Sequence, residues 1–565
     1  MKRRLGLIAL LFVLLFAGIA ARLVALQVID SARWSDLAKR IQEEERIETA
    51  SRGRLFDRNG VLLAQDLPAV SIALDNYHMS QPEVLIDILK RHLSLPEDTL
   101  TKKVYQEGYF TWIQRQVELG AARAIEAEAR NLGALGLIFI DEPKRVYPQQ
   151  ALASNVIGFT GVDHHGLEGA ELAFEEWLAG ADTVVHVQRT GTGIELLRTT
   201  QSVGGPGADV TLTLDARLQQ LAEQKLDEGV RDFSAKDGFA IVLDPRTGEV
   251  LAMAQAKRFD LNHYAQSPAS ARLNQAVARA YEPGSLFKVF TGLAALETQA
   301  VGLNERFDGD RKVRIGGHAF GNAEAGHKFG RVTLKEIIQN SINIGMIQVA
   351  QRVGQQALYR YLQRIGIGRP TGLGLPGELP GSLIPVERWS PLEIGAVAIG
   401  QAVTVTGLQL ASRMAALANE GRIMQPILML AARDVDGNVL ARTRPHSTGR
   451  VASLLNTQLM IDMMKAVVEA GTGMDARLNG FSAAAKSGTA QKVVPGEAGY
   501  SNNKYISSFA GFFPADRPQY FILVVLDEVG DWKGRAGPWG GFTAGSIFKH
   551  IAEGLINLEK LYPNR

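Results

Sequence analysis

The feature that most constrains this chain is an uninterrupted apolar run close to its start. Residues 5–21 contain no charged side chain, the cluster Lys2-Arg3-Arg4 precedes them, and Arg22 follows them. At about 1.5 Å per residue, a helix over this run and its extension to Leu26 approaches the roughly 30 Å hydrocarbon core of a bilayer. The run therefore predicts one transmembrane helix, residues 5–26, followed by a separately folded body.

The sequence around this run indicates its orientation and its fate. The basic tip, residues 1–4, predicts a cytoplasmic N-terminus and an exported body. A cleaved signal peptide is the alternative, because Gly18-Ile19-Ala20 resembles a cleavage site. The apolar pattern continues past that point to Ile29, however, which favours an uncleaved signal anchor. A buried core helix fits poorly with so long a run at the start of the chain.

The bulk composition narrows the class of protein. The chain has 565 residues, more than one hydrophobic core usually supports, which indicates two or more domains. Its 61 basic and 59 acidic residues nearly balance, so we expect no nucleic-acid partner. The absence of cysteine excludes disulfide scaffolds, cysteine-bound zinc and a cysteine nucleophile.

The first part of the body, residues 27–206, contains no recognisable catalytic set. Residues 29–48 are charged with scattered apolar positions, which is typical of a helix that leaves the bilayer. Asn59-Gly60 lies between two short apolar stretches and predicts a hairpin over residues 51–66. Strand and helix signals then alternate. The run Gly204-Gly205-Pro206-Gly207 is the clearest punctuation, and we place a domain boundary there.

The second part, residues 207–561, predicts an α/β domain, which leaves residues 562–565 as a tail. A helix is predicted over residues 214–230, and strands over residues 239–244, 249–253, 483–493, 507–513 and 520–526. Mainly helical sequence fills residues 285–468, and a last helix spans residues 546–561. A sheet built from both ends of this domain, with helices inserted between them, places an active site between sheet and helices.

A serine and a lysine with helical spacing form the first candidate motif. Glu282-Pro283-Gly284 precedes Ser285, and an apolar helical run follows Lys288. Pro and Gly fit the start of a helix, so Ser285 is predicted in its first turn, where backbone N–H groups can face an oxyanion. Residues three apart share a helix face, which lets the Lys288 amine reach the Ser285 hydroxyl. Such a serine needs a base, and lysine serves as one only if burial or nearby cations lower its pKa.

The second motif is a polar cluster in an apolar segment. Thr333 and Glu336 form a capping box, and the stretch Asn340-Ser341-Ile342-Asn343 is predicted within the helix that this box opens. Burying these polar groups without partners would be costly. Beside a serine–lysine pair, Ser341 becomes a proton relay and Asn343 an amide that orients the lysine and the substrate.

The third motif is the run Lys486-Ser487-Gly488-Thr489 in a predicted strand. A glycine within a strand indicates close approach of another chain segment or of a ligand. Ser487 and Thr489 alternate onto one face, where their hydroxyls can bind a substrate carboxylate in the positive field of Lys486.

Each motif alone has an ordinary explanation: a helix with Ser and Lys three apart, a solvent-facing polar stretch, or a flexible loop. All three in this order indicate an acyl-serine enzyme. Two other patterns give no comparable evidence of a functional site. Asp163-His164-His165 lacks companion ligands and is predicted as a solvated loop, and Gly191-Thr192-Gly193 is predicted as a turn. We expect neither a metal nor a cofactor.

Taken together, the motifs resemble those of the penicillin-binding proteins. Residues 52–60, 145–148 and 166–171 resemble signatures of the non-catalytic pedestal of class B members. Anchor, pedestal and transpeptidase without a glycosyltransferase module look like the FtsI-like, division-specific transpeptidases of Gram-negative bacteria. The resemblance covers nearly the whole chain. It implies a penicillin-binding transpeptidase fold of the serine β-lactamase type, with an elongated α+β pedestal and one transmembrane helix.

The resemblance also implies a chemistry. A peptidoglycan stem peptide ending in D-Ala-D-Ala would acylate the serine, and the amine of a second stem peptide would release the acyl group as a cross-link. β-Lactams would acylate the same serine and stay attached. Carried over by motif, the catalytic residues are Ser285, Lys288, Ser341 and Asn343. Those that bind substrate or β-lactam are Lys486, Ser487, Gly488, Thr489 and the cleft-wall residue Tyr505, and the oxyanion hole consists of the backbone N–H groups of Ser285 and Thr489.

For location and partners, the resemblance implies a single-pass protein of the bacterial inner membrane with its catalytic body in the periplasm. The implied partners are stem peptides, β-lactams, a SEDS-type lipid II polymerase (FtsW-like) and other divisome proteins. The chain departs from the family pattern at Leu286-Phe287-Lys288-Val289, Gln401-Ala402 and Gly545-Ser546. These departures leave open whether it is the principal septal enzyme or a paralogue used in particular conditions.

Three other functions remain open from the sequence. A β-lactamase would need a deacylating base, and no E-x-x-L-N-type segment follows Asn343. A D,D-carboxypeptidase would use the same residues with water as the acceptor. A non-catalytic divisome scaffold or β-lactam sensor would explain the long pedestal, although intact motifs argue against a catalytically silent protein.

Overall fold

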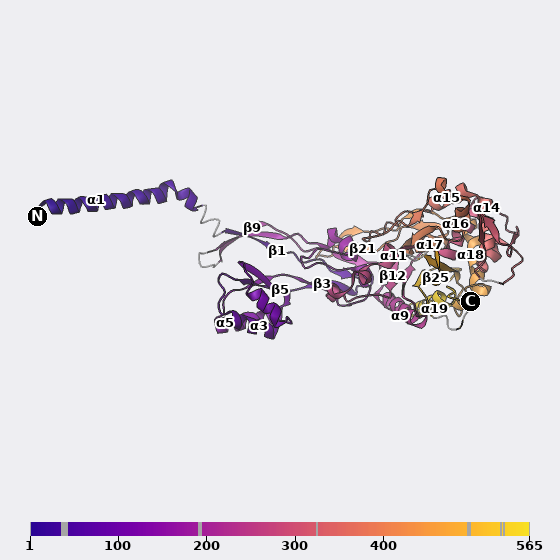
Figure 1. Ribbon diagram of the computed structural model, residues 1–565, viewed down its shortest axis with the longest axis horizontal. Coiled ribbons are helices and arrows are strands. Elements are labelled where there is room, and N and C mark those ends of the chain that lie inside the picture. The colour runs from indigo at the N-terminus through magenta and orange to yellow at the C-terminus, as the bar shows by residue number, and fades with distance from the viewer. Residues whose placement is uncertain are drawn as a thin grey trace. The chain divides into compact units, whose positions relative to one another are not determined.

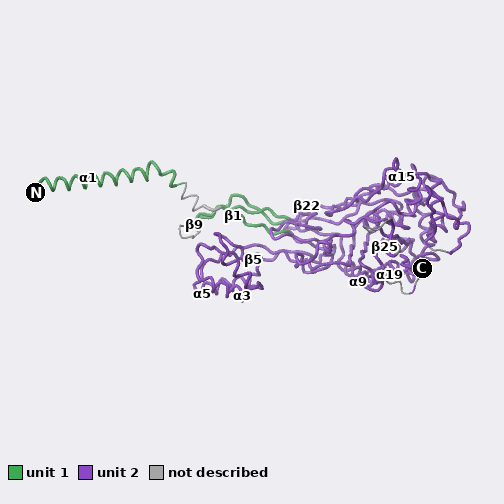
Figure 2. The backbone as a smooth tube through the Cα atoms, in the orientation of Figure 1, with its two compact units in different colours: residues 1–52, 179–207 green, residues 53–178, 208–565 purple. Residues whose placement is uncertain are grey.

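The computed structural model describes residues 2–35, 43–189, 195–323, 326–493, 499–530, 534 and 537–563. The chain forms two compact units, one of residues 1–52 and 179–207 and the other of residues 53–178 and 208–565 (Figure 2). The turn predicted at Gly191-Thr192-Gly193 lies outside the described residues. The boundaries predicted for the pedestal, residues 27–206, and for the transpeptidase domain, residues 207–561, stay predictions.

The smaller unit begins with a long exposed helix. Helix α1, Lys2–Val24, continues into a π-helical turn, Ala25–Ile29, and none of its side chains is buried by protein (Figure 1). By length and composition this helix is long and apolar enough to cross a membrane. It is the one helix of this kind among the described residues, in agreement with the prediction for residues 5–26.

The prediction of a helix over residues 29–48 is wrong for the last part of this range. Residues Glu43–Glu48 form strand β1, which pairs antiparallel with β8, Thr183–Arg189, and β8 pairs with β9, Glu195–Ser202. The buried Val185 and Val187 of β8 belong to a β-branched run that favours a strand. Pairing with a segment so distant in sequence overrides the local preference of a charged stretch for helix.

The larger unit contains a small α+β layer near its start. Strands β4, Ala69–Asp75, β5, Phe110–Glu118, and β6, Leu137–Asp141, form a sheet in the order β5-β4-β6. Three helices pack on it around a shared apolar core: α3, Pro82–His92, α4, Glu97–Val104, and α5, Leu119–Leu132. Short helices follow at α6, Ser154–Ile157, α7, Gly169–Ala173, and α8, Glu175–Leu178.

A six-stranded sheet joins distant parts of the larger unit, in the order β22-β21-β10-β2-β3-β7. The predicted hairpin is present as β2, Leu55–Phe56, and β3, Leu62–Leu67, with Gly60 at φ 87° in its turn. The other strands are β7, Lys144–Val146, β10, Asp209–Leu212, β21, Met429–Arg433, and β22, Val439–Arg442. The sequence pattern did not indicate that β21 would pair with β10, which lies far earlier in the chain, or that β22 would extend the same sheet.

The loop that carries Asp163-His164-His165 is only partly exposed. Asp163 pairs with Arg115 at 2.6 Å, and the side chain of His164, 10% exposed, lies 3.3 Å from the Asp66 carboxylate. The prediction of a solvated loop is therefore wrong for His164, because Asp66 reaches it from a strand far away in the sequence. No group of three potential metal ligands is found among the described residues.

The sheet that positions the motifs is five-stranded and antiparallel, in the order β12-β11-β26-β25-β24. Its strands are β11, Asp237–Leu243, β12, Val250–Gln255, β24, Ala484–Val493, β25, Tyr500–Phe513, and β26, Tyr520–Asp527. All five strands predicted from the sequence are confirmed, and the sheet is built from both ends of the domain as expected. Strand β24, which carries the third motif, lies at one edge.

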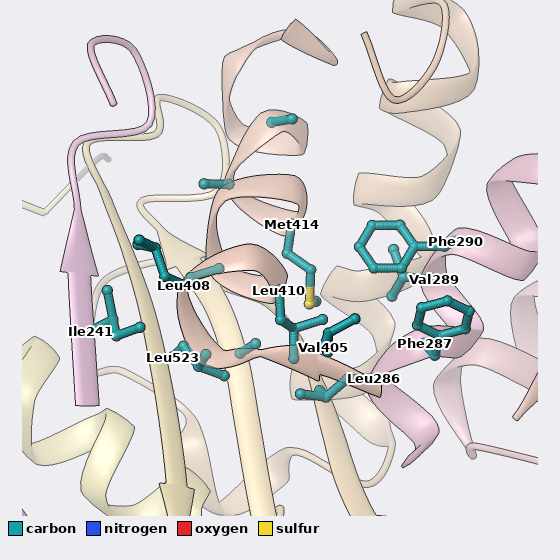
Figure 3. Close-up of a cluster of buried hydrophobic side chains, with 14 of the residues drawn as sticks. Ile241, Leu286, Phe287, Val289, Phe290, Val405, Leu408, Leu410, Met414 and Leu523 are labelled. Carbon is teal, nitrogen blue, oxygen red and sulfur yellow. The ribbon is translucent and has the colours of Figure 1, made fainter. Parts of the chain in front are cut away.

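Alternation along the strands gives the sheet two apolar faces. Ala240 and Val242 of β11 belong to the apolar core shared with helices α9, Ala216–Asp232, and α19, Thr543–Leu558. These two helices lie side by side (Figure 1). Ile241 points to the opposite face, as does Leu523 of β26, toward α17, Gly407–Ala415 (Figure 3). Because a fully buried Val, Leu or Ile side chain contributes about 1.5–3 kcal/mol, the two faces hold the helices firmly on the sheet.

The inserted region is mainly helical, as predicted, with short strands between the helices. Its helices are α10, Ala269–Arg272, α11, Gln275–Ala278, α12, Lys288–Glu297, α13, Leu334–Gln339, α14, Asn343–Val353, α15, Gln355–Arg364, α16, Pro391–Ala398, and α18, Leu454–Ala470. Its short strands are β13, Ala280–Tyr281, β14, Phe307–Asp308, β15, Val313–Ile315, β16, His318–Phe320, β17, Arg331–Val332, β18, Ser382–Leu383, β19, Val403–Thr406, β20, Arg422–Met424, and β23, Ser447–Arg450. The expected mixed α/β body with an α+β N-terminal part is confirmed.

Candidate active site

Ser285 lies in the turn that leads into α12. Residues Gly284–Phe287 form a single 3₁₀ turn, and α12 begins at Lys288. Leu286 and Phe287, fully buried, fix this turn in the core (Figure 3). The Ser285 side chain is left half-buried at the wall of a cavity, which agrees with its predicted place at a helix start.

The second motif does not lie within a helix, so that prediction is wrong. The capping box of Thr333 and Glu336 is present, but α13 ends at Gln339 and α14 starts at Asn343. Ser341 sits in the break at φ 56°, a left-handed conformation that is costly for a residue with a side chain. Such strain is found at functional sites, where the surrounding structure holds it in place.

Lys288 is held by the second motif. Its side chain is fully buried, and Nζ donates to the carbonyl oxygen of Ser341, to Ser341 Oγ at 3.2 Å and to Asn343 Oδ1 at 2.6 Å. Asn343 Nδ2 in turn donates to the Gly321 carbonyl at 3.2 Å. The break between α13 and α14 therefore aims a hydroxyl and an amide at the amine of the first motif.

Lys486, from the third motif, binds the same hydroxyl. It is fully buried on the edge strand β24, and its Nζ donates to Ser341 Oγ at 2.9 Å and to the Ser487 carbonyl at 2.9 Å. Ser341 Oγ thus accepts hydrogen bonds from both amines of the site. This arrangement connects the three motifs through one serine hydroxyl.

The hydroxyl side chains of β24 have partners beyond the three motifs. Ser487 Oγ lies 2.6 Å from Thr472 Oγ1, and Thr489 Oγ1 accepts the Gly540 N–H at 3.0 Å. A side chain on Gly540 would lie 2.1 Å from the Gly488 carbonyl oxygen, so only glycine fits there. Sequence reasoning missed Thr472 and Gly540. The Gly540-Gly541 pair was the available signal for a close approach, whereas nothing in the sequence singled out Thr472.

These elements surround a cavity of about 380 Å³. Four predicted residues line it, Ser285, Ser341, Ser487 and Thr489, while the lysines and Asn343 lie behind them. Further lining residues that the sequence did not indicate include Asn322, His327, Phe329, Thr472, Asp475 and Trp539. Tyr505 is not among the lining residues. It lies on β25 opposite Gln491, and its role in the cleft stays a prediction.

Burial destabilises the protonated form of both lysine amines. Desolvation lowers the pKa of Lys288 well below its usual range, and the charge of Lys486 lowers it further. Desolvation also lowers the pKa of Lys486 to about 7. Because two ammonium groups at one hydroxyl repel each other, Lys288 is the amine that stays neutral. The arrangement can therefore accept a proton at Lys288 and present a positive charge at Lys486.

Replacing Lys486 by methionine is expected to stabilise the protein while removing this charge. Methionine fills the space without an amine to desolvate, so the free energy of unfolding should rise by about 2 kcal/mol near pH 7. The folded pKa of about 7 lies below the usual 10.5, so between these values the unfolded state binds more protons and wild-type stability rises with pH. The advantage of K486M is therefore largest at and below pH 7 and shrinks toward pH 10.

Thermal unfolding of both proteins across this pH range measures the difference. A variant that is less stable than wild type at pH 7, or an advantage that grows as the pH rises, would contradict the depressed pKa of the Lys486 side chain.

The sequence and the fold are similar to those of known proteins. Residues 238–553 match the penicillin binding protein transpeptidase domain, and residues 47–212 match the penicillin-binding protein dimerisation domain. The chain is 32% identical over 568 residues to the probable peptidoglycan D,D-transpeptidase PenA of Neisseria meningitidis, which covers 100% of this chain and 94% of that protein. It is 31% identical over 528 residues to the peptidoglycan D,D-transpeptidase FtsI of Escherichia coli K12, covering 91% and 85%.

A solved structure agrees with these matches. Penicillin binding protein 3 from Mycobacterium tuberculosis, complexed with aztreonam, superposes with a TM-score of 0.69 at 27% identity, over 92% of this chain and 98% of that one. The chain therefore belongs to the class B penicillin-binding proteins, which join a transpeptidase domain to a dimerisation domain.

Proposed function

We propose that this protein is a peptidoglycan D,D-transpeptidase that works through an acyl-serine intermediate in septal wall synthesis. The observation that carries the proposal is the convergence of the three motifs on the Ser341 hydroxyl, beside a cavity that Ser285 also lines. Membership in the penicillin-binding proteins supports the reaction class, as does the D,D-transpeptidase activity for which PenA and FtsI are named.

In the proposed acylation, Ser285 Oγ attacks the carbonyl carbon between the two D-alanines of a donor stem peptide. The hydroxyl proton passes to the neutral Lys288 Nζ, and the backbone N–H groups of Ser285 and Thr489 stabilise the oxyanion. Among the described residues the Ser285 hydroxyl has no hydrogen-bond partner, and Lys288 instead donates to Ser341 and Asn343. Such bonds commonly tighten only when substrate binds.

Collapse of the tetrahedral intermediate breaks the peptide bond. The leaving amine takes a proton from Ser341 Oγ, which is replenished from Lys288, and D-alanine departs with its carboxylate released by Ser487, Thr489 and Lys486. The amine of an acceptor stem peptide then attacks the ester and loses a proton along the same path in reverse. This second half forms the cross-link and restores Ser285.

β-Lactams fit the same site, because they present a strained amide and a carboxylate at the spacing of a D-Ala-D-Ala end. The similar Mycobacterium protein is complexed with aztreonam, which supports β-lactam binding here. A long-lived acyl-enzyme is expected, because no E-x-x-L-N-type segment that could supply a dedicated deacylating base follows Asn343.

The location and the partners complete the proposal. Helix α1 fits a single-pass anchor of the inner membrane with the catalytic body in the periplasm. A SEDS-type lipid II polymerase of the FtsW kind and other divisome proteins would supply nascent glycan strands at the septum. If the role is septal, depletion of the protein produces filamentous cells without septa. Normal division after depletion would assign it to a condition-specific role.

The products formed from a pentapeptide-containing glycan polymer test the reaction class. Full-length protein in detergent is expected to release D-alanine and form cross-linked dimers, and a penicillin should block both. Mass spectrometry separates the outcomes. Tetrapeptide without dimers would indicate a D,D-carboxypeptidase, and rapid hydrolysis of the penicillin would indicate a β-lactamase. Absence of D-alanine release would indicate a non-catalytic scaffold or a β-lactam sensor.

A further inference from the structure

Glu282 connects three chain segments around the nucleophile without lining the cavity. Its Oε1 accepts the Ala402 N–H at 2.9 Å and the Tyr500 O–H at 3.1 Å. Tyr500 begins β25, the strand that pairs with β24 along the third motif. One carboxylate oxygen therefore ties the loop of residues 282–285, which we call the serine loop, to the turn at residue 402 and to the strand pair that binds substrate.

The backbone of the serine loop is packed tightly within this connection. The Gly284 N–H donates to the Gly400 carbonyl at 3.0 Å, and a side chain on Gly400 would lie 2.1 Å from the Gly284 carbonyl oxygen. On its other side, a Cβ on Gly284 would lie 3.0 Å from the Ala490 Cβ of β24. The loop is thus confined between the turn at residues 400–402 and β24, and a small shift of either would move Ser285.

The connection is maintained at an energetic cost. Glu282 Oε2 is buried without a hydrogen-bond partner, which is unfavourable for a carboxylate oxygen. Ala402 adopts φ 56°, a left-handed conformation that disfavours a residue with a side chain. Local costs of this kind are expected where a site needs a fixed geometry, and neither of them contributes to stability.

We infer that Glu282 is a positioning residue, whose Oε1 holds the serine loop in register with β24 so that the N–H groups of Ser285 and Thr489 face the same oxygen atom. The inference rests on the proposed acyl-serine function and deepens it. Hydrogen-bond acceptance by Oε1 is what the position requires, rather than the negative charge. Glutamine keeps that acceptor, and alanine removes it.

Acylation kinetics with a chromogenic β-lactam test this role, because they separate the binding constant from the first-order acylation rate. Glu282→Ala is expected to lower the acylation rate about 30-fold and to change the binding constant less than about threefold. The cavity still binds the drug, but a displaced serine attacks it slowly. Glu282→Gln should stay within about threefold of wild type. Tyr500→Phe keeps the carboxylate, removes one of its two donors, and should give an intermediate loss.

Glu223→Ala is a matched control. Glu223 is buried and, like Glu282, accepts a backbone N–H, here from Ala153 at 2.9 Å, and it does not line the cavity. Its replacement should lower thermal stability while the acylation rate of the folded fraction stays near that of wild type. Equal losses for E282A and E223A would reduce Glu282 to a structural residue.

Two other results would overturn the inference. E282Q as slow as E282A would make charge the requirement, and unchanged acylation in both E282A and Tyr500→Phe would show that nothing is positioned by this contact. Failure of the proposed function itself looks different, because wild type would then form no adduct at all.

Discussion

Replacing Ser285 by alanine is expected to abolish the penicillin adduct and to reduce transpeptidation at least about 10⁴-fold. Ser285 is the one hydroxyl that stands both in the turn before α12 and at the cavity wall among the described residues. The neighbouring Ser341 accepts hydrogen bonds from two amines and sits in the break between α13 and α14. Loss of Ser285 therefore leaves the binding site intact but removes the atom that forms the ester.

Intact-mass measurement of wild type and variant after exposure to a penicillin decides the matter. Wild type should gain the mass of one drug molecule and keep it, and S285A should gain none. Ser267→Ala, at the end of a 3₁₀ segment away from the cavity lining, is the control and should label like wild type. Labelling of S285A would move the nucleophile to another residue and contradict the assignment of the first motif.

Local patterns predicted the parts of this site that depend on a few neighbouring residues. Pro283-Gly284 before an apolar run marks a helix start, and the structure places Ser285 in that first turn. Short, mostly apolar runs bounded by turns indicated strands such as β11 and β12. These features follow from propensity and periodicity, which act over a few residues.

The parts that the sequence did not predict depend on contacts between distant segments. The capping box at Thr333 indicated a helix that continues through residues 340–343. Ser341 instead adopts a left-handed conformation, which no local sequence pattern indicates. Thr472 and Gly540 join the site through contacts with hydroxyl side chains of β24, which form only once the chain has folded. Strand β1 likewise forms because β8 offers it a partner. Pairing and burial that are fixed only in the folded state override local preference in each case.

Replacing Lys288 by arginine is expected to lower acylation of Ser285 about 10³-fold at every pH at which the protein is folded. Arginine keeps the positive charge and can donate to Ser341 and Asn343, but it does not lose its proton in proteins. The burial that depresses the pKa of Lys288 then gives the variant no neutral form to accept the serine proton. Lys288→Met should lose activity equally, which separates the need for a base from the need for a charge.

The pH dependence of acylation distinguishes the two lysines. In wild type the rate should rise with pH as Lys288 loses its proton, and then fall above about pH 7 as Lys486, whose pKa is about 7, loses the charge that attracts the substrate carboxylate. Stopped-flow acylation between about pH 5 and pH 9 measures both limbs. The rising limb should disappear in K288R. If it persists, the proton must go to Lys486, the other amine at the Ser341 hydroxyl, because that shared contact lets either lysine reach the same relay.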